Sequence, residues 1–194
     1  MFSIENLKDL REKTGASITD VKKALEESSG DFAKALKIIQ KKLGNVSEKK
    51  LSRETRAGLV DAYIHSNGRV GAIVEIFCET DFVARNQSFK ELAHDLAMHI
   101  TAVSPLYLSI DQVPEEIWSI GKKRFEEEAR ALGKPENITR EIVDGKLKSY
   151  FGALCLLEQP FVKDEDRTVK EVVNEAIGKF GENIKIGRFV RLEI

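Results

Sequence analysis

The stretch Gly58–Thr80, GLVDAYIHSNGRVGAIVEIFCET, decides the fold of this chain. Two runs rich in β-branched and aromatic residues, 59–65 and 69–79, flank the sequence Ser66-Asn67-Gly68. Asn-Gly between such runs is a strong β-hairpin signal, because both residues accept the positive φ angles that a tight turn needs. The stretch therefore predicts two antiparallel strands joined by a short turn.

The second of these strands is apolar on both faces. One face carries Val70, Ala72, Val74, Ile76 and Cys78. The opposite face carries Ile73 and Phe77 together with Glu75 and Glu79. Because buried strands lose the simple alternation of apolar and polar residues, we expect this strand to be covered over much of both sides.

Three short helices are predicted upstream, within the first 44 residues. Gly15 ends the first, and Ser17 or Thr19 begins the second by accepting hydrogen bonds from free backbone amides. Asp31 caps the third, which Gly44 closes. We therefore divide the chain into a helical bundle at 1–44, a polar linker helix at 45–56 and a core domain at 57–194. Such a small bundle has too little interior for a cofactor pocket and favours a binding role.

Helices dominate the remainder, which ends in a strand. Ser88 and Glu91 form a capping-box pattern for a helix to about residue 102, and a charged helix starts at Pro114. Further helices are predicted at 138–143, 146–157 and 168–180, before a strand at 184–194. The expected class is α+β: a three-helix bundle followed by a three-stranded antiparallel sheet with helices packed on it.

Composition indicates a soluble protein with no membrane partner. The 194 residues are 42% hydrophobic and 32% charged, and no apolar run approaches the roughly 20 residues that span a bilayer. The first residues, Met1 to Glu5, lack the apolar core of a signal peptide, so we expect a cytoplasmic location. Cys78 and Cys155 stand far apart in apolar surroundings, which predicts two reduced core residues.

Charge is distributed unevenly along the chain. The net charge is −1, which argues against direct nucleic-acid binding. Residues 1–56 nevertheless carry 13 Lys and Arg against 9 Asp and Glu, leaving 18 against 23 for residues 57–194. The basic front suits an acidic protein surface or RNA, although a solvated helix face is the more common explanation of such a pattern.

The sequence contains none of the common catalytic motifs. It has no phosphate-binding glycine loop, no H-E-x-x-H and no G-x-S-x-G. His94 and His99 are five residues apart, out of register for one helix face, and no thiolate lies nearby to complete a zinc site. A Cys78–His nucleophilic pair stays open as an alternative. We expect a protein that is not an enzyme and has no cofactor or bound metal.

The segment that follows the hairpin is the candidate binding site. Glu79–Asn86 places an acid and a large aromatic at a strand-to-helix junction. Phe82 and Val83 either tuck under the following helix or leave Phe82 exposed as a binding anchor.

Six short segments resemble the elongation factor Ts family, in order along the whole chain. They are Leu10–Ala16 (LREKTGA), Asp20–Leu25 (DVKKAL), Thr80–Asn86 (TDFVARN), Ala97–Ile100 (AMHI), Gln159–Val162 (QPFV), and Gly181–Ile184 (GENI) with Arg188–Arg191 (RFVR). The length is similar to that of short members, which have one core subdomain where longer members have two and an inserted helical hairpin. The resemblance implies a ubiquitin-associated-like bundle at 1–44.

The resemblance also implies a partner and a mechanism. Its members bind the GTPase elongation factor Tu and release its GDP by inserting the TDFV loop, which here is Thr80, Asp81, Phe82 and Val83. Phe82 would wedge between partner helices and dislodge the groups that hold Mg²⁺. Further partner contacts implied by the matching segments are Lys22, His99, Val162 and Lys163.

Two other implications stay open at this point. Short members pair their sheets into dimers, so a homodimer is a further expectation. The alternative function is a ubiquitin-associated-like adaptor without exchange activity, which a buried Phe82 would favour.

Overall fold

The computed structural model describes residues 3–48 and 50–194, and for 44–48 it describes the backbone alone. Lys49 of the predicted linker lies outside the described residues. The chain forms two compact units. The first comprises Met1–Asp61, Ile73–His94 and Lys170–Phe189, and the second comprises Ala62–Ala72, Asp95–Val169 and Val190–Ile194.

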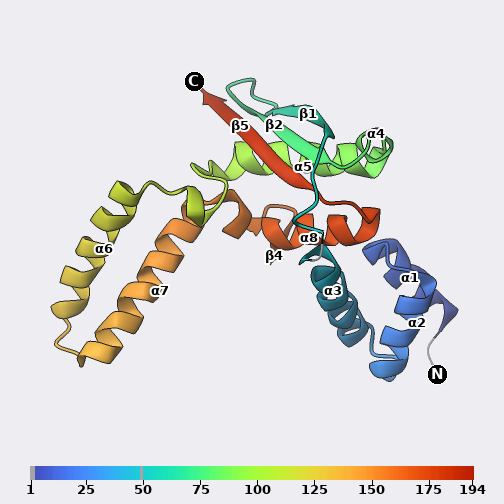
Figure 1. Ribbon diagram of the computed structural model, residues 1–194, viewed down its shortest axis with the longest axis horizontal. Coiled ribbons are helices and arrows are strands. Elements are labelled where there is room, and N and C mark those ends of the chain that lie inside the picture. The colour runs from blue at the N-terminus through green and yellow to red at the C-terminus, as the bar shows by residue number, and fades with distance from the viewer. Residues whose placement is uncertain (1–2, 49) are drawn as a thin grey trace. The chain divides into compact units, whose positions relative to one another are not determined.

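The amino-terminal bundle consists of α1 (Ile4–Thr14), α2 (Ile18–Glu27) and α3 (Phe32–Glu48), as Figure 1 shows. The Ser17 side chain accepts a hydrogen bond from the Asp20 amide at 3.1 Å, and the Asp31 side chain accepts one from Lys34 at 3.0 Å. Gly15 ends α1 at a φ of 63°, where a side chain would be strained. The bundle encloses its own apolar core of Leu10, Ala16, Val21, Ala24, Leu25, Ala35, Ile39 and Leu43.

The third helix is longer than predicted. It continues to Glu48, so Gly44 does not end it. A glycine inside a helix costs only about 1 kcal/mol, which the surrounding turns can offset. Residues 50–56 then form a turn and irregular backbone where we expected a linker helix.

The sheet confirms the predicted α+β class. Strands β1 (Ala57–Ile64), β2 (Val70–Cys78) and β5 (Lys185–Glu193) form an antiparallel sheet in the order β1-β2-β5, with helices packed on it. A turn at the predicted position joins β1 to β2: the Gly68 amide donates to the His65 carbonyl at 2.8 Å. Gly68 adopts a φ of 66°, whereas Asn67 does not have the positive φ that the sequence pattern allows.

One face of β2 is buried and the other is open. Ala72, Val74, Ile76 and Cys78 are buried, as their alternation predicted. Ile73 on the opposite face is 50% exposed, and Phe77 is also exposed. The prediction that this strand is covered on both sides is wrong for the single chain, because an apolar pattern shows that a face is suited to burial without supplying what covers it.

A short α4 (Asp81–Ala84) leads into α5 (Gln87–Val103), and α8 (Val169–Phe180) precedes β5. The predicted capping box at Ser88 is wrong. Asn86 caps α5 instead, because its side chain accepts a hydrogen bond from the Ser88 amide at 2.9 Å. Both residues are good caps, so local sequence alone does not choose between them.

Two long helices of the second unit, α6 (Glu115–Arg130) and α7 (Glu136–Leu154), form a hairpin (Figure 1). We predicted separate helices at 138–143 and 146–157, and the resemblance to short family members gave no reason to expect a helical hairpin. Trp118 and Phe151 stack with ring centroids 4.7 Å apart. The hairpin core contains Phe125, Ala129, Val143, Leu147 and Phe151.

The remaining elements of the second unit are short. Two 3-10 turns lie at Ile110–Gln112 and Leu156–Glu158. Strands β3 (Pro160–Phe161) and β4 (Asp164–Thr168) pair antiparallel, with Phe161 opposite Asp164, and the sequence did not predict them. Within residues 3–48 and 50–194, no helix is both long and apolar enough to cross a membrane.

We predict that Gly58→Ala destabilises the protein, because a Cβ at this position would lie 2.3 Å from the Ile76 carbonyl oxygen, a backbone atom that cannot swing aside. The expected loss is about 1–3 kcal/mol in the free energy of unfolding, measured by urea titration. Gly145→Ala is the control, since it meets open space within α7 and should add about 0.5–1 kcal/mol. Equal stabilities for the two variants would contradict this packing.

Candidate functional site

The TDFV loop presents one aromatic side chain to solvent. Thr80 caps α4, its hydroxyl accepting a hydrogen bond from the Val83 amide at 3.5 Å. Val83 is 4% exposed and Ala84 is also buried, whereas Phe82 is 82% exposed. Each of the two open interpretations therefore holds for one residue: Val83 is buried, and Phe82 is exposed.

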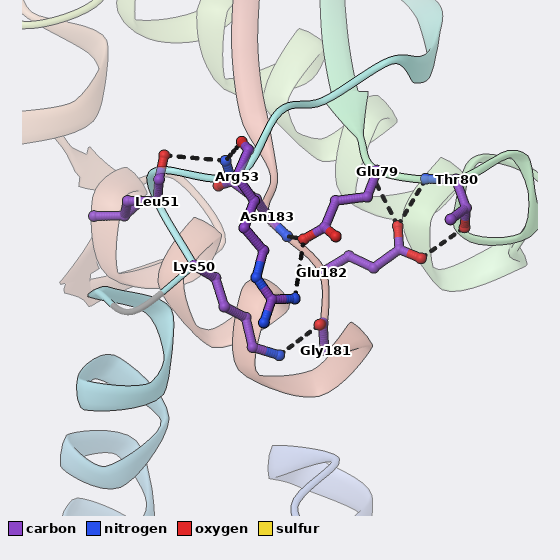
Figure 2. A network of polar contacts seen from close by, with 8 residues as sticks. All are labelled: Lys50, Leu51, Arg53, Glu79, Thr80, Gly181, Glu182 and Asn183. Carbon is purple, nitrogen blue, oxygen red and sulfur yellow. Dashed lines mark hydrogen bonds and ion pairs between the residues drawn. The ribbon is translucent and has the colours of Figure 1, made fainter.

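A carboxylate from a distant segment holds the base of this loop (Figure 2). One oxygen of Glu182 accepts hydrogen bonds from the backbone amides of Glu79 and Thr80, at 3.1 and 3.0 Å. Its other oxygen accepts the Thr80 hydroxyl at 2.6 Å. Three donors at the entrance to the loop are thus satisfied by one ionised side chain, the stronger kind of acceptor.

Asn183, the residue after Glu182, donates a hydrogen bond back to Glu79. The Asn183 amide donates to the Glu79 carboxylate at 2.6 Å, and Arg53 lies 3.6 Å from the same oxygen. The Asn183 side chain is fully buried and donates to the carbonyls of Leu51 and Arg53, at 3.2 and 2.7 Å. The segment that follows α3 is therefore bonded to the residues that hold the loop (Figure 2).

Cys78 belongs to the same support and is unsuited to nucleophilic catalysis. Its thiol is buried and donates to the Thr80 carbonyl at 3.2 Å. Burial, reinforced by the nearby Glu182 carboxylate, raises the pKa of Cys78 and keeps the sulfur protonated. Cys155 is also buried and free, so both cysteines are reduced core residues, as predicted.

His99 lies in the second unit and is 0% exposed. Its Nδ1 accepts a hydrogen bond from the Val162 amide at 3.1 Å, which places the ring proton on Nε2, 3.0 Å from Gln159 Oε1. The ring also stacks on Phe161, with centroids 5.9 Å apart. Both ring nitrogens therefore have hydrogen-bond partners within the chain. This is the arrangement of a structural histidine packed beside a helix, and not that of an exposed partner contact.

The structure brings His99 together with the predicted contacts Val162 and Lys163. Val162 is exposed where β3 ends, and Lys163 pairs with Asp95 of α5 at 3.0 Å. Lys22 lies elsewhere, exposed on α2 of the first unit. Sequence reasoning missed Glu182 and Asn183 as site residues, although they form the centre of the GENI segment. The sequence feature that could have identified them is a charged residue and an asparagine directly after Gly181, the glycine that ends the helix.

Metal-binding side chains do not gather anywhere in the described part of the chain: no group of three or more His, Cys, Asp or Glu is arranged to hold an ion.

Comparison with known proteins shows the family. The model of the elongation factor TS family matches residues 3–194. The elongation factor Ts of Thermotoga petrophila is 49% identical over 193 residues, which is 100% of this chain and 96% of that protein. The Rubrobacter xylanophilus protein is 48% identical over 191 residues (98% of each chain), and that of Carboxydothermus hydrogenoformans is 48% identical over 196 residues (100% and 89%). The chain belongs to the elongation factor Ts family, as the six segments predicted.

We predict that protonation of His99 destabilises the protein. Burial lowers the pKa of His99 below its usual 6.5, and the bond to Gln159 opposes this only in part. The unfolded chain then binds the proton more readily, so stability is complete above pH 6.5 and declines below it. The expected slope is at most about 1.4 kcal/mol per pH unit.

The measurement compares unfolding free energies at about pH 7.5 and about pH 5.5 for the wild type and His99→Asn. Asparagine keeps an acceptor near the Nδ1 position and does not titrate. The variant should lose less stability than the wild type over this interval. An identical pH dependence in the two proteins would show that His99 does not carry the effect.

Proposed function

We propose that this protein is a guanine-nucleotide exchange factor for elongation factor Tu, which it binds in the GDP-bound state. The observation that carries the proposal is the TDFV loop, which displays Phe82 at 82% exposure from a base fixed by Val83 and Thr80. An exposed phenylalanine on an ordered support is suited to enter a pocket of another protein, because little conformational entropy remains to be lost on binding.

In this proposal the loop from Thr80 to Val83 enters the G domain of the partner. Phe82 separates partner helices and thereby displaces the groups that hold Mg²⁺ beside the nucleotide. The ion belongs to the partner, where it bridges phosphate oxygens to the protein, so its displacement weakens GDP binding. This chain makes and breaks no covalent bond in the process.

Magnitudes show that the loop cannot act alone. Accelerating GDP release ten-thousandfold requires lowering the barrier by about 5.5 kcal/mol. Burying one phenylalanine contributes roughly 1.5–3 kcal/mol. The rest must come from a broad interface, of at least about 1,200 Å².

The other implied contacts supply candidates for that interface. Val162 and Lys163 are exposed, as residues that contact a partner must be. His99 is proposed to act beside them, and it touches a partner directly only if its ring leaves the Val162 amide and Gln159. While buried, it contributes by holding Val162 in place.

The bundle is proposed to be a second binding site, with Lys22 as its contact. Lys22 is exposed on α2, next to residues whose side chains form the bundle core. A module joined to the core by a short connector raises the effective concentration of the other module once one has bound.

A homodimer is a further proposal, supported by the apolar side chains that the sheet leaves exposed. They are Val60 and Ile64 of β1, Ile73 and Phe77 of β2, and Val190 and Leu192 of β5. Exposed apolar residues on all three strands suit burial against a second sheet.

The competing function is an adaptor that binds a protein through the bundle and has no exchange activity. A buried Phe82 would have favoured that alternative. Phe82 is exposed, which argues against it.

The test is release of a fluorescent GDP analogue from elongation factor Tu. Wild-type protein should accelerate it, and Phe82→Ala should reduce the acceleration by about one to two orders of magnitude, because the wedge is lost. The melting temperature should hardly change, since an exposed side chain contributes little to the core. Val83→Ala is the control, because it removes a buried group and should lower the melting temperature. Unimpaired exchange by Phe82→Ala would refute the role of the loop.

Removing residues 1–48, which leaves Lys50 to bond the Gly181 carbonyl, should weaken the complex far more than the bundle's own contacts suggest, because tethering is lost. The residual core should still accelerate GDP release at saturating concentration. Lys22→Glu in the full chain should mainly speed dissociation, with a smaller effect on the maximal release rate. If the truncated protein gives no acceleration at saturation, the division of roles between bundle and core is wrong.

A further inference from the structure

Glu182 carries more of the loop's hydrogen bonds than any other side chain described here, yet neither the family resemblance nor the sequence motifs give it a role. We propose that Glu182 is a positioning residue, which holds the TDFV loop in the conformation that inserts Phe82 into the partner. The inference rests on the proposed exchange function and adds a residue that acts through the loop without touching the nucleotide.

The geometry places all three bonds from Glu182 at the start of the loop. The amides of Glu79 and Thr80 and the Thr80 hydroxyl point at one carboxylate, at 3.1, 3.0 and 2.6 Å. These are the last backbone donors before α4, whose second residue is Phe82. Fixing them fixes the direction in which α4 leaves β2, and therefore where Phe82 points.

The position of Glu182 is itself fixed from both sides. Before it, Gly181 turns the chain at a φ of 75°, and its carbonyl accepts a hydrogen bond from Lys50. After it, Asn183 is bonded to the Glu79 carboxylate and to the carbonyls of Leu51 and Arg53 (Figure 2). A side chain anchored on such a backbone is preorganised, which is what supporting residues of a functional site require.

Removing Glu182 should change nucleotide exchange in a way that a general loss of folding would not. Without Glu182 the loop samples other conformations, and insertion of Phe82 must then restrict it at the moment of exchange. The bundle and the residues near Val162 still bind the partner. The maximal rate of GDP release should therefore fall more than the affinity.

The experiment measures release of a fluorescent GDP analogue from elongation factor Tu against concentration of the full-length protein. Glu182→Ala should lower the maximal release rate at least about tenfold and change the half-saturating concentration less, because charge-assisted bonds to the loop are lost. Glu182→Gln should stay within about twofold of wild type, since an amide of the same shape accepts both backbone bonds and donates to the Thr80 oxygen. Glu127→Ala, which removes an exposed carboxylate from α6, is the matched control.

A double-mutant cycle with Phe82→Ala distinguishes positioning from a general loss of structure. If Glu182 acts through Phe82, then Glu182→Ala should have little further effect in the Phe82→Ala protein. Additive losses, or a higher half-saturating concentration with an unchanged maximal rate, would overturn the proposal. Should Glu182→Ala fail to fold, Glu182→Asp replaces it: the shorter side chain cannot reach all three donors, so the maximal rate should fall severalfold, and a rate equal to wild type would overturn the proposal.

The wild type and Glu127→Ala separate the two proposals. If neither accelerates GDP release, the exchange function fails. If both do and Glu182→Ala matches them, only the positioning role fails.

Discussion

Glu182 accepts hydrogen bonds from the backbone amides of Glu79 and Thr80, and Glu79 accepts one from the amide of Asn183. These reciprocal bonds join the end of β2 to the end of α8. The two glutamates lie 103 residues apart in sequence. Each carboxylate satisfies amides that have left regular structure, where an unpaired donor would otherwise be costly. Further bonds link Glu182 to Thr80, which caps α4 and its exposed Phe82, and link Asn183 to the residues after α3 at Leu51 and Arg53.

In the second unit, too, a side chain accepts a hydrogen bond from a backbone amide, but the acceptor is an imidazole instead of a carboxylate. A buried imidazole accepts the Val162 amide, and a lowered pKa keeps His99 neutral so that it can do so. Gln159 orients the ring from the other side and is anchored on the Ala153 carbonyl at 2.7 Å. In both units, surface residues proposed to contact the partner are held in place by a polar side chain that is partly or fully buried. If these residues bind the partner as proposed, their surface is ordered before binding.

Much of the candidate site could be predicted from sequence, and the parts that could not share one cause. Phe82 was identified because an aromatic at a strand-to-helix junction is chemically conspicuous and lies in a family motif. Its exposure stayed undecided, because Phe82 and Val83 are equally apolar and their burial depends on what packs against α4. The role of Glu182 was missed because the bonds that define it come from residues more than 100 positions away. His99 was assigned to the partner, although its surroundings bury it.

Local chemistry determined what the sequence could specify by itself. Asn67-Gly68 fixes the hairpin turn, Ser17 and Asp31 cap their helices, and alternation predicts the buried face of β2, since each depends on neighbours within a few residues. Tertiary structure decided the rest: that Asn86 caps α5, that α3 passes through Gly44, and that Glu182 meets Thr80. These outcomes turn on competition between locally similar alternatives, and contacts between distant segments supply the free energy that selects one of them.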